Sequence, residues 1–134
     1  MQSKWADAIH QSKIGTLSAM CAEGADINSL DSYGQTGLML AAKAGDAEVV
    51  RWMIEHHANL DHTAKYGLSA VMLAVINGHV ETVSELVSAG ADLGLTGSGA
   101  PGFQDKTVLD LALERGDQLV IDILEAASNH GKQT

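Results

Sequence analysis

The stretch DSYGQTGLMLAAKAGDAEVVRWMIEHHANLDHT at residues 31–63 is followed directly by AKYGLSAVMLAVINGHVETVSELVSAGADLGLT at residues 64–96. The two stretches align without a gap and are identical at 11 of 33 positions. The identities include Gly45 with Gly78 and Glu48 with Glu81. Self-similarity at this period predicts a stack of short units, because one such unit cannot bury its apolar face alone.

Each unit carries signals for two helices and a projecting turn. Thr36 stands where the N-cap of a helix belongs, and Ser69 and Thr107 occupy the equivalent positions in later units. Gly45 can adopt the left-handed conformation that ends a helix, and the apolar residues beyond it recur at helical spacing. The sequence therefore predicts two antiparallel helices in each unit.

The pattern G-x-T-x-L-x-x-A-x-x-G-[DH]-x-E-x-V, followed by G-A-D-[LIV], resembles the ankyrin repeat. The residues that carry the resemblance are Gly34, Thr36, Leu38, Ala41, Gly45 and Val50 in one unit and Gly67, Ala74, Gly78, His79, Val83, Gly90, Ala91 and Asp92 in the next. It extends from about Ala6 to Glu125. It implies an all-α ankyrin-repeat solenoid of stacked helix-turn-helix units with projecting β-hairpin loops.

Four units account for the chain as a single domain over residues 1–134, with boundaries near 1–30, 31–63, 64–96 and 97–127. The first and last units are degenerate and are predicted to be caps, with Ser12 in place of a turn glycine. Five residues are inserted between Ser69 and Thr107, and we assign them to the Gly-rich run at 97–102. Residues 128–134 are predicted to form a polar tail that frays.

Three further positions carry predictions about packing. Trp5 is expected to cover the open end of the stack, and Trp52 to face either the outer surface or the next unit. The family usually has Pro after the capping Thr, whereas this chain has Gly37. Because Pro suits the first helical position, the substitution Gly37→Pro is expected to raise the free energy of unfolding by about 0.4–1 kcal/mol.

Composition and charge narrow the class of protein. The lone cysteine, the start without a basic segment followed by an apolar run, and the lack of a long apolar stretch predict a cytoplasmic protein that does not enter membranes. A net charge of -9 opposes the phosphates of nucleic acids. The same charge favours basic or neutral partners and a monomeric state.

We find no pattern typical of catalysis or of a cofactor site. His56, His57 and His62, with Asp61 nearby, fall at a helix end and in a turn, without the spacing of a complete ligand set. Cys21 lies on an apolar stripe, where we expect it to be buried and inert. Walker, G-x-G-x-x-G and G-x-S-x-G motifs do not occur. The sequence therefore predicts a protein that is not an enzyme and has neither metal nor cofactor.

Proteins of the ankyrin family commonly bind partners on the concave surface formed by the hairpin tips and the first helices. The resemblance therefore predicts a binding site for a protein or peptide at Tyr33, Gln35, Lys43, Tyr66, Leu68, Ile76, Asn77, Phe103 and Arg115. Leu68 and Ile76 are expected to be exposed, and Tyr33 and Tyr66 to project in parallel about 10 Å apart. The tyrosines could instead be a repeated hairpin residue that stacks between units.

The predicted function is a non-catalytic interaction module. The alternative is a regulatory or inhibitory subunit that blocks an enzyme or toxin with the loop at 97–103.

Overall fold

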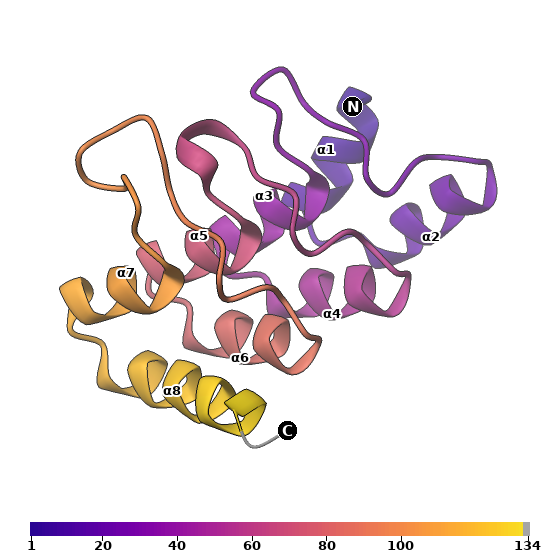
Figure 1. Cartoon of the computed structure of the whole chain (residues 1–134). Coiled ribbons are helices and arrows are strands. Elements are labelled where there is room, and N and C mark those ends of the chain that lie inside the picture. The colour runs from indigo at the N-terminus through magenta and orange to yellow at the C-terminus, as the bar shows by residue number, and fades with distance from the viewer. Residues whose placement is uncertain (133–134) are drawn as a thin grey trace.

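The computed structural model describes residues 1–132 and contains, over that range, eight α-helices and one 3₁₀ turn. The elements are α1 (Ser3–His10), α2 (Ile14–Ala22), α3 (Gly37–Ala44), α4 (Ala47–Glu55), η1 (Lys65–Gly67), α5 (Ala70–Ile76), α6 (Val80–Ser88), α7 (Val108–Arg115) and α8 (Gln118–Lys132). Figure 1 shows the odd-numbered helices in one layer, the even-numbered helices in a second layer, and the long loops projecting from the stack. The predicted all-α solenoid of helix pairs is confirmed.

Successive units pack helix against helix along both layers. Helix α3 contacts α1 and α5, α5 contacts α7, and α6 contacts α4 and α8. One fully buried side chain from each second helix, namely Leu17, Met53, Leu86 and Leu124, contributes to the same core. The core therefore runs continuously through all four units, as stacked repeats require.

All three predicted N-cap positions are confirmed, and two of them carry the side-chain hydrogen bond of a cap. The Thr36 hydroxyl accepts a hydrogen bond from the backbone N–H of Met39 at 3.2 Å. The Thr107 hydroxyl accepts from Asp110, and the Asp110 carboxylate accepts in return from Thr107 at 2.9 Å, which completes a capping box. Ser69 is different, because its hydroxyl is buried without a hydrogen-bond partner in the described part of the chain. Ser69 is thus the N-cap residue of α5, but the side-chain hydrogen bond expected there is absent. Ser lacks the γ-methyl group that restricts the Thr rotamer.

The chain reversals use left-handed backbone where the sequence predicted it. Gly45 ends α3 with a φ of 76°, and Ser12, at the equivalent position in the first unit, has a φ of 56°. Ser12 also donates a hydrogen bond to the carboxylate of Asp46 in the next unit. The interpretation of Ser12 as a substitute for the turn glycine is confirmed.

Gly37 begins α3, as predicted, but the space around it is full. A Cβ atom built there would lie 2.7 Å from Cδ1 of Ile9 and 3.0 Å from Cε of Met53, and both side chains are buried. Overpacking of this kind destabilises a core by about 1–3 kcal/mol. From these contacts we expect Gly37→Pro to destabilise the protein instead, because side chains fill the space beside this position.

Side chains in the loops connect one unit to the next. The Asn28 side-chain oxygen accepts from the backbone N–H of Asn59 at 2.8 Å, and the Asp61 carboxylate accepts from Asp92 at 2.8 Å. Gly94 stands at the next equivalent position and has no side chain with which to continue the series. We refer to these two bonds as the loop ladder, and they fix the spacing between three successive loops.

The loops contain little β-structure. Two isolated bridges, Leu30 with Thr36 and Gly97 with Gln104, occur over residues 1–132, and no strand is assigned in that range. The solenoid is thus confirmed, whereas the β-hairpin form of its loops is not.

Both tryptophans pack toward the interface between the first two units. Trp5 is 2% exposed, and its ring centre lies 6.4 Å from that of Trp52. The Trp52 indole N–H donates to the hydroxyl of Ser18 in the first unit at 3.2 Å. Trp5 therefore does not cover the open end, and Trp52 faces the preceding unit instead of the outer surface or the next unit. Both predictions are wrong, since periodicity does not specify which neighbour a helix face meets.

The last unit has the polar surface of a cap. Asp110 and Glu125 are exposed at positions where the third unit has buried Met72 and half-buried Val87. Helix α8 continues through Ala127 to Lys132, so most of the predicted tail is helical. Residues 133–134 lie outside the described residues.

Candidate partner-binding face

The aromatic centre of the predicted site is a contact between the third and fourth units. The rings of Tyr66 and Phe103 lie 5.4 Å apart between centres, with an interplanar angle of 30°. The ammonium group of Lys65 lies 4.9 Å from the centre of the Tyr66 ring, within the range of a cation–π interaction. Both aromatic side chains are half-buried. Phe103 is therefore packed against its neighbour and does not extend freely into solvent.

The inserted loop is tied down at several points. Gly97 donates to the carbonyl of Lys106 at 2.9 Å and accepts from Asp105 at 3.0 Å. The Ser98 N–H donates to the carbonyl of Tyr66 at 2.8 Å, which fixes the loop to the tip of the third unit. A Cβ atom at Gly97 would lie 2.2 Å from the carbonyl oxygen of Phe103, so this close approach requires glycine.

Tyr33 has a different environment from Tyr66. It is 76% exposed, and the carboxylate of Asp31 accepts hydrogen bonds from the N–H groups of Tyr33 and Gln35, each at 2.9 Å. Ala64 takes the place of Asp31 in the third unit, and there Tyr66 is left-handed with a φ of 66°. The two tyrosines therefore differ in backbone conformation and in contacts, so the equivalence that parallel projection requires does not hold.

The ends of the first helices supply the polar part of the face. Lys43 and Asn77 are exposed beside half-buried Ile76, and the Asn77 amide donates to the carbonyl of Leu73 at 2.8 Å. The Arg115 guanidinium donates to the carbonyl of Ile76 at 2.9 Å and thereby caps the end of α5. Arg115 thus contributes to the contact between the third and fourth units, a role that the repeat pattern does not predict.

Two predicted site residues face inward. Leu68 is 7% exposed and belongs to the core, so the prediction of an exposed Leu68 is wrong. The side-chain oxygen of Gln35 is buried without a hydrogen-bond partner among the described residues. Half-buried Ile76 is less exposed than predicted. The turn that precedes each first helix points these side chains toward the stack, and the alignment of repeats does not reveal this direction.

The histidines that resemble metal ligands have other contacts. His56 stacks on Trp52 with ring centres 4.2 Å apart, and one of its ring nitrogens lies 2.8 Å from the Trp52 carbonyl oxygen. A ring nitrogen of His62 lies 2.9 Å from the carbonyl oxygen of Gly34. Among the residues that the structure describes, no three His, Cys, Asp or Glu side chains are grouped so that they could hold a metal ion.

Cys21 is half-buried and not fully buried as predicted. Its partial burial raises the pKa of the thiol, which lowers the fraction of reactive thiolate at neutral pH. This environment is the opposite of the one that activates a cysteine nucleophile.

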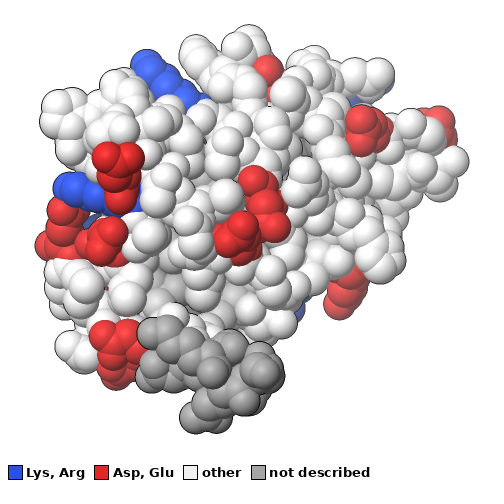
Figure 2. All heavy atoms as spheres, viewed as in Figure 1, with Lys and Arg blue, Asp and Glu red and all other residues white. Residues whose placement is uncertain are grey.

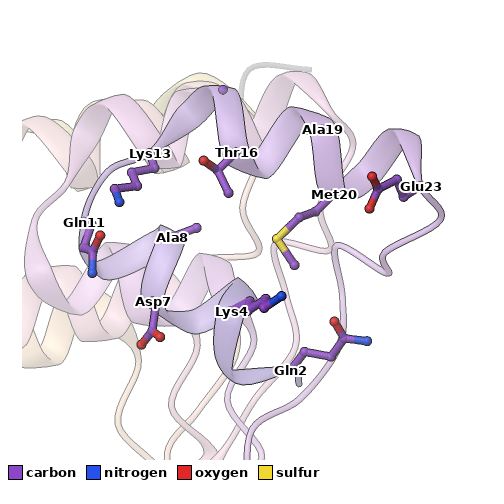
Figure 3. Close-up of a pocket in the computed structure, with 11 residues that line it drawn as sticks. Gln2, Lys4, Asp7, Ala8, Gln11, Lys13, Thr16, Ala19, Met20 and Glu23 are labelled. Carbon is purple, nitrogen blue, oxygen red and sulfur yellow. The ribbon is translucent and has the colours of Figure 1, made fainter.

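A hollow on the described surface lies at the N-terminal end of the stack, away from the predicted site. It measures about 710 Å³, and Figure 3 shows its walls on α1 and α2. Lys4, Asp7 and Gln11 line it at positions where the second unit has Gly37, Leu40 and Ala44. Polar residues thus replace small and apolar ones on the surface that an additional unit would cover. This hollow is the outer side of the N-terminal cap.

Charge is distributed unevenly over the surface. Figure 2 shows acidic side chains scattered across one side of the molecule, whereas the few basic atoms visible lie mainly at its upper left and left edges. On the outer surface Arg51 pairs with Glu81 at 3.1 Å and with Glu85 at 3.2 Å. The hydrogen bonds to Glu85 and Glu81 raise the pKa of Arg51.

A family model described as ankyrin repeats, in three copies, matches residues 7–97. The chain therefore belongs to the ankyrin repeat family. Proteins of this family are in general protein–protein interaction modules and are typically non-catalytic. None of the helices that the structure describes has both the length and the apolar character needed to cross a membrane.

The chain is similar to the G patch domain and ankyrin repeat-containing protein 1 homolog of Drosophila melanogaster. The two are 37% identical over 64 residues, which cover 48% of this chain and 19% of that protein. The match thus spans about a fifth of the length of this relative.

Proposed function

We propose that this protein binds a partner protein or peptide on its concave face and catalyses no reaction. The binding centre is the Tyr66–Phe103 contact, with exposed Tyr33 and the polar groups of Lys43 and Asn77 around it. A monomer in the cytoplasm that binds neither nucleic acid nor membranes remains our inference from composition and charge.

The observation that carries the proposal is the concentration of aromatic surface on one face. Tyr33 has the highest exposed fraction among the large exposed hydrophobic side chains of the described residues, at 76%. Tyr66 and Phe103 are half-buried, and they are held in place by a tied loop instead of being mobile. Rigid aromatic side chains bury a large area on binding at low entropic cost.

Substitution at the aromatic residues tests the face. A partner is first captured from native lysate, identified, purified and titrated against the protein. The double change Tyr33→Ala and Phe103→Ala is expected to weaken binding by about 2 kcal/mol or more, or roughly thirtyfold in Kd. Helical content by circular dichroism should stay unchanged, because both side chains lie outside the main core.

A matched control uses Leu119→Ala. Leu119 is 65% exposed on α8, so its removal deletes a comparable apolar side chain without disturbing the core. If Leu119→Ala abolished binding while the double change left Kd within about twofold, the concave face would not be the site.

The ordered conformation of the inserted loop also supports a second function for the protein, that of an inhibitor. Five backbone hydrogen bonds join residues of the loop between Gly97 and Lys106, and the Gly99 N–H donates to the side chain of Gln104. A pre-organised loop loses less entropy when it enters a partner's cleft. A regulatory or inhibitory subunit that blocks an enzyme or toxin with residues 97–103 is therefore our alternative proposal. Shortening this loop at residues 98–102 while keeping Phe103 should abolish binding by an inhibitor, whereas binding centred on the Tyr66–Phe103 contact should survive it.

A further inference from the structure

The concave face differs from the rest of the molecule in charge. Four of the eight Lys and Arg residues lie on it, namely Lys43, Lys65, Lys106 and Arg115, together with three of the 17 acidic residues, Asp31, Asp105 and Glu114. The face therefore carries a net charge of +1, while the remaining four cations and 14 acids give the rest of the chain -10. The net charge of this face thus has the opposite sign to that of the rest of the chain.

Among the described residues, three of the four cations have no carboxylate partner. Lys106 pairs with Glu114, and Arg115 donates to the Ile76 carbonyl. Lys43 and Lys65 are exposed, and no carboxylate of the described residues lies within salt-bridge distance of either ammonium group. These two cations belong to neighbouring units, and the ammonium group of Lys65 lies over the Tyr66 ring.

The acids on this face are already engaged. The Asp31 carboxylate accepts two backbone hydrogen bonds, and Asp105 accepts from the side-chain amide of Gln104 at 3.2 Å. Glu114 is paired with Lys106. The unpaired charge that a partner meets here is therefore positive.

We propose that the concave face binds an extended acidic segment of a partner protein, in which Asp or Glu residues flank an aromatic or apolar residue. The flanking carboxylates pair with Lys43 and Lys65, and the central side chain packs on the Tyr66–Phe103 contact. This inference rests on the proposed function and adds the chemistry of the partner.

The acidic surface elsewhere contributes to the selectivity of this site. Like charges repel, so an acidic segment is disfavoured on the outer surface around Glu81 and Glu85 and is restricted to the one cationic face. At physiological salt the Debye length is about 8 Å, so nearby cations outweigh the distant acids in binding a short segment. A basic segment would instead meet unpaired Lys43 and Lys65.

Labelled peptides test the chemistry directly. Fluorescence anisotropy is measured with fluorescein-labelled EEEFEEE, with the uncharged QQQFQQQ, and with the basic KKKFKKK, at about 0.15 M salt. We expect the acidic peptide to bind at least about tenfold more tightly than the glutamine peptide, because charge-assisted hydrogen bonds are roughly twice as strong as neutral ones. The basic peptide should bind most weakly to the concave face.

Matched variants assign the effect to the two lysines. Lys43→Gln combined with Lys65→Gln is expected to reduce affinity for the acidic peptide to about that for the glutamine peptide. Arg51→Gln removes one cation from the outer surface and serves as the control, with no expected change in peptide affinity. Circular dichroism checks that both variants remain folded.

The proposal is overturned if the acidic and glutamine peptides bind equally, if the basic peptide competes with the acidic one on the concave face with higher affinity, or if no acidic peptide binds below about 1 mM. If any of these results is obtained, the proposed function still holds as long as Tyr33→Ala combined with Phe103→Ala weakens binding of the captured partner. Loss of that aromatic dependence, in contrast, refutes the proposed function itself.

Discussion

Gly37→Pro is the substitution for which the local sequence and the packing predict opposite results. Thr36 has extended backbone with a ψ of 166°, as the residue before a proline requires. The N–H at the first helical position has no intrahelical acceptor to lose. Considered as a helix start alone, the change should stabilise the protein by about 0.4–1 kcal/mol.

The packing of the preceding unit opposes this gain. The new Cβ atom would lie 2.7 Å from Cδ1 of Ile9 and 3.2 Å from the indole nitrogen of Trp5. Both residues are at most 3% exposed, so they cannot move aside without displacing other core atoms. With about 1–3 kcal/mol for overpacking, we expect a net destabilisation of about 1–2 kcal/mol, measured as a lower midpoint of urea unfolding at unchanged m-value.

Two further variants make this prediction specific. Ile9→Val removes the Cδ1 atom, so the double variant should show a favourable coupling of about 1 kcal/mol in a double-mutant cycle. Ala70→Pro is the matched control, since Ala70 begins α5 after an extended Ser69, and Ala42 stands where the first unit has Ile9. It should be neutral or stabilising by up to about 1 kcal/mol. If Gly37→Pro alone raised stability, the close contact with Ile9 would be refuted as the deciding interaction.

Three other predictions follow from individual contacts. Asp61→Ala removes the acceptor for the Asp92 N–H in the loop ladder and should lower the free energy of unfolding by about 0.5–1.5 kcal/mol in urea titrations. Asp122→Ala, at an exposed position of α8, is the control and should change the free energy of unfolding by less than about 0.5 kcal/mol. Thr107→Ala removes the side-chain acceptor of a capping box and should lower the free energy of unfolding by about 1 kcal/mol. Ser69→Ala removes a buried hydroxyl without a partner in the described chain and should leave the stability in thermal unfolding unchanged or slightly higher. Equal losses of stability in the two variants would contradict the difference between the two sites. Cys21 should react more slowly with Ellman's reagent than free cysteine at neutral pH, because burial raises the pKa of its thiol and lowers the thiolate fraction. The reaction rate should rise as pH rises through that elevated pKa. Equal rates for the native and the urea-unfolded protein would contradict this prediction.

The local features of the fold could be predicted because they depend on residues close together in the chain. The cap at Thr36 and the left-handed Gly45 each involve only a few consecutive residues. The same is true of Ser12, whose place in the repeat indicated a turn. Of the predicted site, exposed Tyr33, Lys43 and Asn77 could be placed on the surface by the repeat register alone.

The remaining features depend on which atoms of the next unit lie opposite. The aligned repeats do not specify that Trp52 meets Ser18 or that Arg115 reaches the Ile76 carbonyl, since those residues are more than thirty positions apart. Leu68 and Tyr66 occupy the same repeat positions as Gln35 and Tyr33. The inserted loop is hydrogen-bonded to the tip of the third unit, which carries Tyr66, and not to the tip of the second unit, which carries Tyr33.

The sequence by itself therefore determined the architecture of this protein, namely a stack of four helix pairs with polar ends, because a repeated apolar pattern has few ways to bury itself. Only the tertiary structure decided which aromatic side chains form the binding centre, which cations remain unpaired and why Gly37 must be small. Those properties arise from contacts between units, where packing is dense enough that a single methyl group changes the result.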